Sequence, residues 1–114
     1  MPTIQLEKAT KRYRVQHTLF EAVSEIDLTI RQGEFVFVVG SSGAGKSTLL
    51  QLLTGQIRPD SGMALLDGVN MAPLSLFCSA KTRRYFGYVS QESQLMRRRT
   101  VFENLTMVAR VSGL

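Results

Sequence analysis

The chain has 114 residues, of which 44% are hydrophobic and 20% charged, and its formal net charge is +5. This length suits one small domain or part of a larger one, and the composition is ordinary for a globular protein. No apolar run approaches the roughly 20 residues that span a bilayer, and the N-terminus lacks the layout of a secretion signal. The single Cys78 excludes an internal disulfide and indicates a reducing compartment, so we expect a cytosolic protein.

The basic residues form three short groups, around Lys11, around Arg83 and around Arg98. No recognition helix, zinc finger or aromatic RNA-binding pattern accompanies them. We therefore expect a solvated face or a contact with a protein or a membrane surface, and no sequence-specific nucleic-acid binding.

The first part of the chain predicts strands. Ile4–Ala9 can form a first strand, and Glu25–Ile30 alternates strictly between polar and apolar residues, which is typical of a half-buried antiparallel strand. The segment 31–34 makes a turn into Phe35–Val39. This continuous apolar run predicts a buried parallel strand.

The most informative motif follows that run. Residues 40–47, Gly-Ser-Ser-Gly-Ala-Gly-Lys-Ser, fit the pattern G-x-x-x-x-G-K-[ST] of a phosphate-binding loop. Glycines let the backbone N–H groups turn around an anion, Lys46 can reach the β- and γ-phosphates, and the Ser47 hydroxyl can bind Mg²⁺. The alternative is a glycine-rich surface turn that fits by chance, which a preceding strand and a following helix argue against.

Lys46–Leu53 reads as that helix, with leucines at core-facing spacing and Gly55 as its C′ residue. Its N-terminus would direct free N–H groups and the positive end of its dipole at the phosphates. Residues 58–62 then predict a turn, Met63–Leu66 a short strand, and Asp67-Gly68 its exit.

The last part of the chain predicts a strand and a helix. Tyr85–Ser90 reads as a strand, and the segment 70–82 has no clear assignment. Thr100 and Glu103 have capping-box spacing and open a helix that runs towards Val111, with Phe102, Leu105, Val108 and Ala109 on one face.

Two further residues distinguish among the classes of nucleotide-binding protein. Gln91 follows the predicted strand 85–90 directly, where a strand end can present its side chain to a site, although it can also merely cap that strand. Tyr13 stands in a basic segment ahead of the strands, where it can also be an exposed loop aromatic.

With these residues the chain resembles the N-terminal half of an ATP-binding cassette (ABC) ATPase. Tyr13 matches the aromatic residue that stacks on adenine in this family, residues 40–48 match its Walker A motif, and Gln91 matches its Q-loop glutamine. The segments 6–13, 33–36, 59–62 and 99–105 also fall at the relative positions of the family, so the resemblance covers essentially the whole chain.

The resemblance implies an α/β fold of the P-loop NTPase type with an antiparallel β side-sheet, in which residues 1–114 are the N-terminal part of a single ATP-binding domain. It implies ATP and Mg²⁺ as cofactors, with Lys46 and Gln91 as catalytic residues and Ser47 and Gln91 as metal ligands. The nucleotide-binding residues that it implies are Tyr13, Gly40, Ser41, Ser42, Gly43, Ala44, Gly45, Lys46, Ser47 and Thr48.

Family members run longer than this chain, and their second half carries the signature loop, the Walker B aspartate, the catalytic glutamate and the switch histidine. We therefore expect a C-terminally truncated chain that by itself binds ATP weakly or not at all and hydrolyses it negligibly. In the family two strands of that half lie between the strands predicted at 35–39 and 85–90. Without them the core sheet would expose apolar edges.

Within the family the segments 33–37, 42–50, 99–104 and 109–111 most resemble the cell-division ATP-binding proteins of the FtsE type. This resemblance implies a homodimer of the full-length ATPase, bound at the inner face of the cell membrane through an integral membrane partner, FtsX-like or a permease. The open alternatives are the ATPase of a lipoprotein, drug or peptide exporter, and a nucleotide-binding module without hydrolysis. Arg97–Arg99 stand near the position where the family often has a proline, in the region that contacts the membrane partner.

Overall fold

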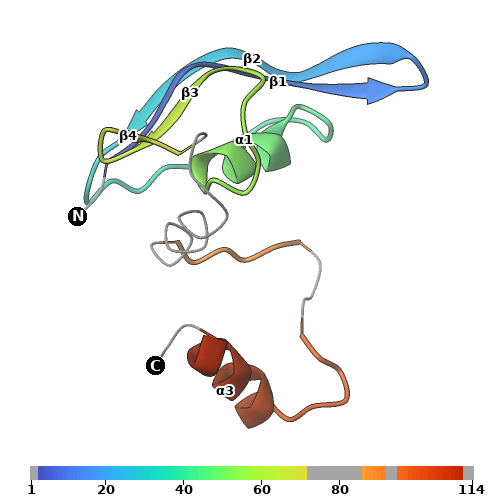
Figure 1. The fold of residues 1–114 in the computed structure, drawn as a ribbon, viewed down its shortest axis with the longest axis vertical. Helices are drawn as coiled ribbons and strands as arrows, with labels where there is room; N and C mark the ends of the chain where they lie inside the picture. The colour runs from blue at the N-terminus through green and yellow to red at the C-terminus, as the bar shows by residue number, and fades with distance from the viewer. Residues whose placement is uncertain (1–2, 72–85, 92–94, 112–114) are drawn as a thin grey trace.

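Among the residues that the structure describes, four antiparallel strands form one sheet, and one helix packs against it (Figure 1). The structure, a computed structural model, describes residues 3–71, 86–91 and 95–111. Its strands and helices are β1 (Ile4–Val15), β2 (Thr18–Ile30), α1 (Lys46–Leu53), β3 (Ser61–Leu66), β4 (Val69–Asn70) and α3 (Val101–Val111). The strand order is β2-β1-β3-β4, so the predicted antiparallel side-sheet is confirmed.

The hairpin of β1 and β2 is longer than the sequence indicated. The first strand continues past Ala9 to Val15, and the second begins at Thr18 rather than Glu25. Gln16 and His17 form the turn with φ values of 49° and 69°, the left-handed pair that matches the twist of two-residue hairpins. Tyr13 therefore lies inside a strand and not in a loop ahead of the strands.

A bulge bends β1, the strand that lies between β2 and β3 in the sheet. Lys8 has a φ of 45°, and its N–H donates to Oδ1 of Asp27 at 2.9 Å. Gly62 of β3 packs directly on this bulge, because a Cβ at Gly62 would overlap the carbonyl oxygen of Lys8. The bulge increases the local twist and carries the hairpin over α1, as Figure 1 shows.

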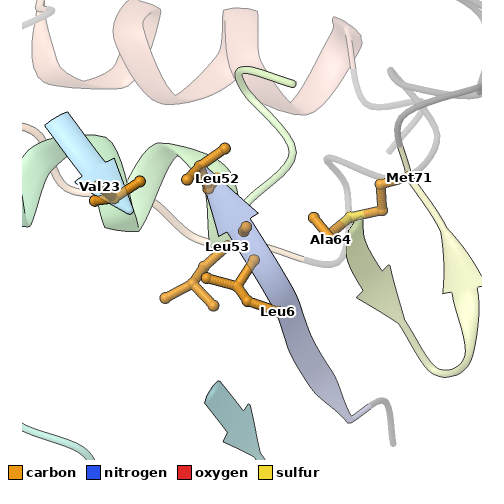
Figure 2. Close-up of a cluster of buried hydrophobic side chains, with 7 residues drawn as sticks. Leu6, Val23, Leu52, Leu53, Ala64 and Met71 are labelled. Atoms are coloured by element: carbon orange, nitrogen blue, oxygen red, sulfur yellow. The ribbon is translucent and has the colours of Figure 1, made fainter. Parts of the chain in front are cut away.

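The core lies between this sheet and α1. Figure 2 shows the buried cluster, which includes Leu52 and Leu53 of the helix, Leu6 of β1 and Val23 of β2. Ala9, Ala64 and Met71 complete the buried set. Thr10 is also buried, and its Oγ1 accepts a hydrogen bond from the Glu25 N–H at 2.9 Å, so this polar group is satisfied.

The helix α1 has the predicted bounds and the predicted end. Gly55, with a φ of 73°, donates to the Leu52 carbonyl, and Gln56 donates to the Gln51 carbonyl at 2.9 Å. These two bonds form a Schellman motif with Gly55 at C′, as the sequence indicated.

The prediction of a buried parallel strand at Phe35–Val39 is wrong for the part of the chain that the structure describes. The segment pairs with no described strand, and Phe35, Phe37 and Val39 are exposed, Phe35 by 84%. The two phenylalanine rings meet edge to face with centroids 5.1 Å apart. A parallel strand takes its partners through crossovers, whereas every strand pair among the described residues is antiparallel.

The predicted strand 85–90 is not formed as a strand over its described residues, 86–90. Phe86 packs against the core cluster, whereas Val89 is exposed. Tyr85, Cys78 and the unassigned segment 72–82 lie outside the described residues.

The C-terminal helix α3 begins where the capping box predicted. The Glu103 N–H donates to Thr100 Oγ1 at 3.0 Å. Its apolar face does not enter the core, because Phe102, Leu105 and Val108 are exposed. Figure 1 shows α3 apart from the sheet and α1.

Candidate functional site

The phosphate-binding loop joins the extended segment 35–39 to α1 and is shaped by left-handed glycines. Gly43 and Gly45 have φ values of 82° and 95°. Residues other than glycine rarely adopt such values, because their Cβ atom clashes with the backbone. A Cβ at Gly45 would also overlap the carbonyl oxygen of Ala22, so the loop rests directly on β2. The sequence folds this way because both positions are glycine.

Lys46 is the first residue of α1, and its ammonium group turns back over the loop. Nζ donates to the carbonyl of Gly40 and, at 2.7 Å, to that of Ser41. The lysine thus lies beside the loop that it would serve, and both of these acceptors are backbone oxygens of that loop. An anion in the loop would offer the same ammonium group a charged acceptor, which forms the stronger hydrogen bond.

The first turn of α1 supplies backbone donors. The first hydrogen bond of the helix runs from the Leu49 N–H to the Gly45 carbonyl at 2.9 Å. The amides of Lys46, Ser47 and Thr48 precede it and point along the helix axis toward the loop. Together with the helix dipole they form a site that favours an anion.

One cavity of about 460 Å³ joins the predicted site residues from three parts of the chain. Its lining comprises Tyr13 of β1, Gln91 after the segment 86–90, Phe20 and Ala22 of β2, and Ser42, Gly43, Gly45, Lys46, Ser47 and Thr48. Gly40, Ser41 and Ala44 belong to the loop but do not line this cavity. The Ala44 N–H instead closes the loop on the Ser41 carbonyl at 3.1 Å.

Tyr13 is held at the rim of this cavity by two charged neighbours. Lys11 Nζ lies 5.5 Å from the centroid of its ring and 3.8 Å from Oδ1 of Asp60. Oδ2 of Asp60 accepts a hydrogen bond from the Arg12 N–H at 2.6 Å, one residue before Tyr13. The Asp60 N–H donates to the Thr10 carbonyl at 2.7 Å. Asp60 therefore fixes the backbone of β1 where Tyr13 leaves it.

The cavity also has lining residues that sequence reasoning missed, Phe20 and Ala22. No motif includes them, and the sequence patterns predict no strand for the segment 10–24 in which they lie. The signal that finds them is the register, because Phe20 lies directly opposite Tyr13 in the hairpin.

The donor set of the cavity fits ATP with Mg²⁺. A serine hydroxyl and an amide oxygen, from Ser47 and Gln91, are the hard oxygen ligands that Mg²⁺ accepts while it keeps waters and phosphate oxygens. Within the described residues no group of three or more His, Cys, Asp or Glu side chains could hold a metal by itself. Any magnesium in this cavity would therefore rely on phosphate for much of its coordination.

Comparisons with known proteins identify the family to which this chain is similar. A family model described as "ABC transporter" matches residues 23–114. The methionine import ATP-binding protein MetN 1 of Listeria innocua serovar 6a is 36% identical over 111 residues, covering 97% of this chain and 33% of that protein.

Two solved structures are similar over nearly the whole chain. The dimeric structure of MJ0796, a bacterial ABC transporter cassette, superposes with a TM-score of 0.90 at 30% identity, covering 97% of this chain and 48% of the cassette. A dimeric post-hydrolysis structure of MJ0796 bound to ADP and Pi has a TM-score of 0.87 at 30% identity, over 95% of this chain and 47% of that one.

This chain thus spans about a third of the length of the curated relative and about half of the solved cassettes. The agreement of the family model, the relative and the fold confirms the α/β cassette fold of the P-loop NTPase type. The chain belongs to the ABC transporter family.

Proposed function

We propose that the cavity between the β1–β2 hairpin and the phosphate-binding loop binds ATP with Mg²⁺. The single observation that supports this most is that Tyr13, Lys46, Ser47 and Gln91 line one cavity although they come from three separate parts of the chain. An aromatic ring at one end and an anion-binding loop at the other match the two ends of a nucleotide.

At the phosphate end, the amides that open α1 and the Lys46 ammonium group supply hydrogen bonds and positive charge. To reach a phosphate oxygen, Lys46 exchanges its bonds to the carbonyls of Gly40 and Ser41 for charge-assisted ones. At the metal, Ser47 and Gln91 provide oxygen ligands. Bound Mg²⁺ would neutralise negative charge on the phosphates.

We further propose that the natural protein hydrolyses ATP as a homodimer. One relative of similar fold, MJ0796, is a dimeric cassette in two solved structures, one of them described as a post-hydrolysis state bound to ADP and Pi. Gln91 is the residue of this chain that we assign to the attacking water or the metal, since it ends a segment that Phe86 anchors to the core.

A second groove suits a membrane partner. A cavity of about 470 Å³ lies along α3, and its lining includes Met96, Phe102 and Met107 with Arg99 and Arg110. The Asn104 side chain ties the preceding turn to the helix, because its Oδ1 accepts from the Met96 N–H at 2.9 Å. We propose that a cytoplasmic helix of an integral membrane subunit docks here.

In the part of the chain that the structure describes, no helix has the length and apolar character needed to cross a membrane. The proposed partner supplies the membrane attachment, which places this subunit at the inner face of the membrane.

Two roles compete for the membrane complex. The relative from Listeria innocua is named for methionine import, which favours uptake of methionine or a similar small solute. The segments 33–37, 99–104 and 109–111 favour the FtsE-like cell-division role through their resemblance to that subgroup. Deleting the gene separates the two, because loss of labelled-methionine uptake at normal cell length supports import, and filamentous cells with normal uptake support division.

The hydrolytic role is tested on the natural protein. Replacing Gln91 with Ala is expected to lower Mg²⁺-dependent ATP turnover far more than it lowers ATP affinity. Gln56→Ala is the matched control, since Gln56 lies past the other end of α1, where its Nε2 donates to Thr54 Oγ1. Equal turnover in the Gln91→Ala variant and the unaltered protein would contradict the role given to Gln91.

A further inference from the structure

Two aromatic residues face each other across the β1–β2 hairpin at the rim of the nucleotide cavity. Tyr13 and Phe20 are direct register partners in the antiparallel pair. Directly opposite residues point to the same face of a sheet, with Cβ atoms only ~5 Å apart. Both side chains line the cavity that also contains Lys46 and Ser47.

The base of the hairpin is joined to the phosphate-binding loop by contact. Ala22 is two residues along β2 from Phe20, and both residues line the cavity. The Ala22 carbonyl packs directly against Gly45, and a Cβ at that position would overlap the carbonyl oxygen. The position of Phe20 relative to the phosphate amides is therefore fixed by the fold and not by a mobile loop.

The two rings differ in how they are held. Lys11 Nζ lies over the Tyr13 ring and is tied to Asp60. Tyr13 is 37% exposed, whereas Phe20 is 53% exposed. An apolar ring with half of its surface in water gains from a planar apolar partner, because burial of that surface is favourable.

We propose that Phe20 is a second base-contacting residue, which together with Tyr13 forms a two-ring receptor for the nucleobase of the bound nucleotide. This inference rests on the proposed binding of ATP at this cavity. Phe20 contributes apolar and stacking contact only, since its ring has no hydrogen-bonding group. It therefore strengthens the binding of a nucleoside triphosphate and not that of the phosphate chain.

The test compares two ligands on the natural protein by calorimetry, MgATP and magnesium tripolyphosphate, which has the phosphates without the base. Stacking on an aromatic side chain is worth about 1–3 kcal/mol per base, so Phe20→Ala should weaken ATP binding by about tenfold. Binding of tripolyphosphate should stay within about twofold. Phe20→Tyr should retain ATP affinity, and Phe20→Leu, which keeps an apolar side chain without the ring, should lose part of it.

Leu19→Ala is the matched control. Leu19 is the neighbouring exposed apolar residue of β2 and lies opposite Arg14, so alternation directs it to the other face. Both ligands should bind this variant as they bind the unaltered protein.

Three results would overturn the proposal. Unchanged ATP affinity in Phe20→Ala would remove Phe20 from the site. An equal loss for ATP and tripolyphosphate would show damage to the fold rather than loss of a base contact. If the unaltered protein bound neither ligand, the proposed function itself would fail, and that result differs from the first two.

Discussion

Two regions of the molecule can be compared, the sheet packed on α1 and the segments outside it. They differ in the sequence separation between an apolar side chain and the residues that could bury it. In the sheet, β1 pairs with β2 across a two-residue turn, and Leu6, Val23 and Leu52 are buried together. Outside it, Phe35, Phe37 and Leu105 have comparable apolar character and are exposed.

The difference shows that apolar character alone does not place a side chain in the core. In a hairpin, each strand pairs with the strand that is its neighbour in the sequence. A parallel strand or a lone amphipathic helix needs a packing partner from a distant part of the chain. The nucleotide cavity lies on the hairpin side of this division. Among the described residues after α1, Gln91 lines this cavity, and Phe86 of the same segment packs on the core.

The largest expected effect breaks the sheet at the bulge. Gly62→Ala in the 114-residue chain should lower the free energy of unfolding by more than about 4 kcal/mol, because a Cβ there overlaps the carbonyl of Lys8 at a φ of 78°. Gly68→Ala is the matched control, since Gly68 has a φ of 83° but open space around its missing Cβ. The control should cost only about 1–2 kcal/mol. Urea denaturation gives both values, and equal losses would mean that the bulge does not pack on β3.

The next prediction compares a leucine of the core with a leucine of the exposed helix α3. Leu52 is fully buried, so Leu52→Ala in the same chain should cost about 2–5 kcal/mol through lost burial and a cavity. Leu105 is 67% exposed, and Leu105→Ala should stay within about 0.5 kcal/mol. A large cost at Leu105 would show that α3 packs on another part of this chain.

The smallest expected effect is on the loss of stability at acid pH, and it comes from Glu21 of the β1–β2 hairpin. The hydrogen bond from Arg12, at 3.1 Å, holds the pKa of Glu21 below its ordinary value, and a bond with Ser24 lowers it further. A lowered pKa in the folded state stabilises the fold above the ordinary carboxyl range and loses that contribution as the pH falls through the lowered pKa. Glu21→Gln should therefore slightly reduce the drop in urea midpoint between neutral and acid pH, most visibly at low salt. An identical acid drop in both proteins would contradict this role.

Much of the fold could be predicted because local chemistry determines it. The helix α1 spans Lys46–Leu53 as predicted, and Gly55 marks its end. The start of α3 was predicted from the capping residue Thr100. The hairpin extension was missed because Gln16 and His17 form a left-handed turn without the glycine or asparagine that usually announces one.

The rest of the misprediction has a different cause. The apolar run 35–39 records a preference for burial, and a sequence pattern does not state which strands will be adjacent. The motif residues of the candidate site could be predicted because their spacing is tied to phosphate chemistry. Phe20 could not, because only the register of the hairpin brings it to Tyr13.

The most direct test of the account measures binding of MgATP to the natural protein and to its Lys46→Ala variant. The account predicts about a 10- to 100-fold loss of affinity, the worth of a charge-assisted hydrogen bond to phosphate. The melting temperature without nucleotide should stay close to that of the unaltered protein, because Nζ bonds only loop carbonyls at the surface. Equal affinity in the two proteins would contradict the assignment of this loop as the ATP site.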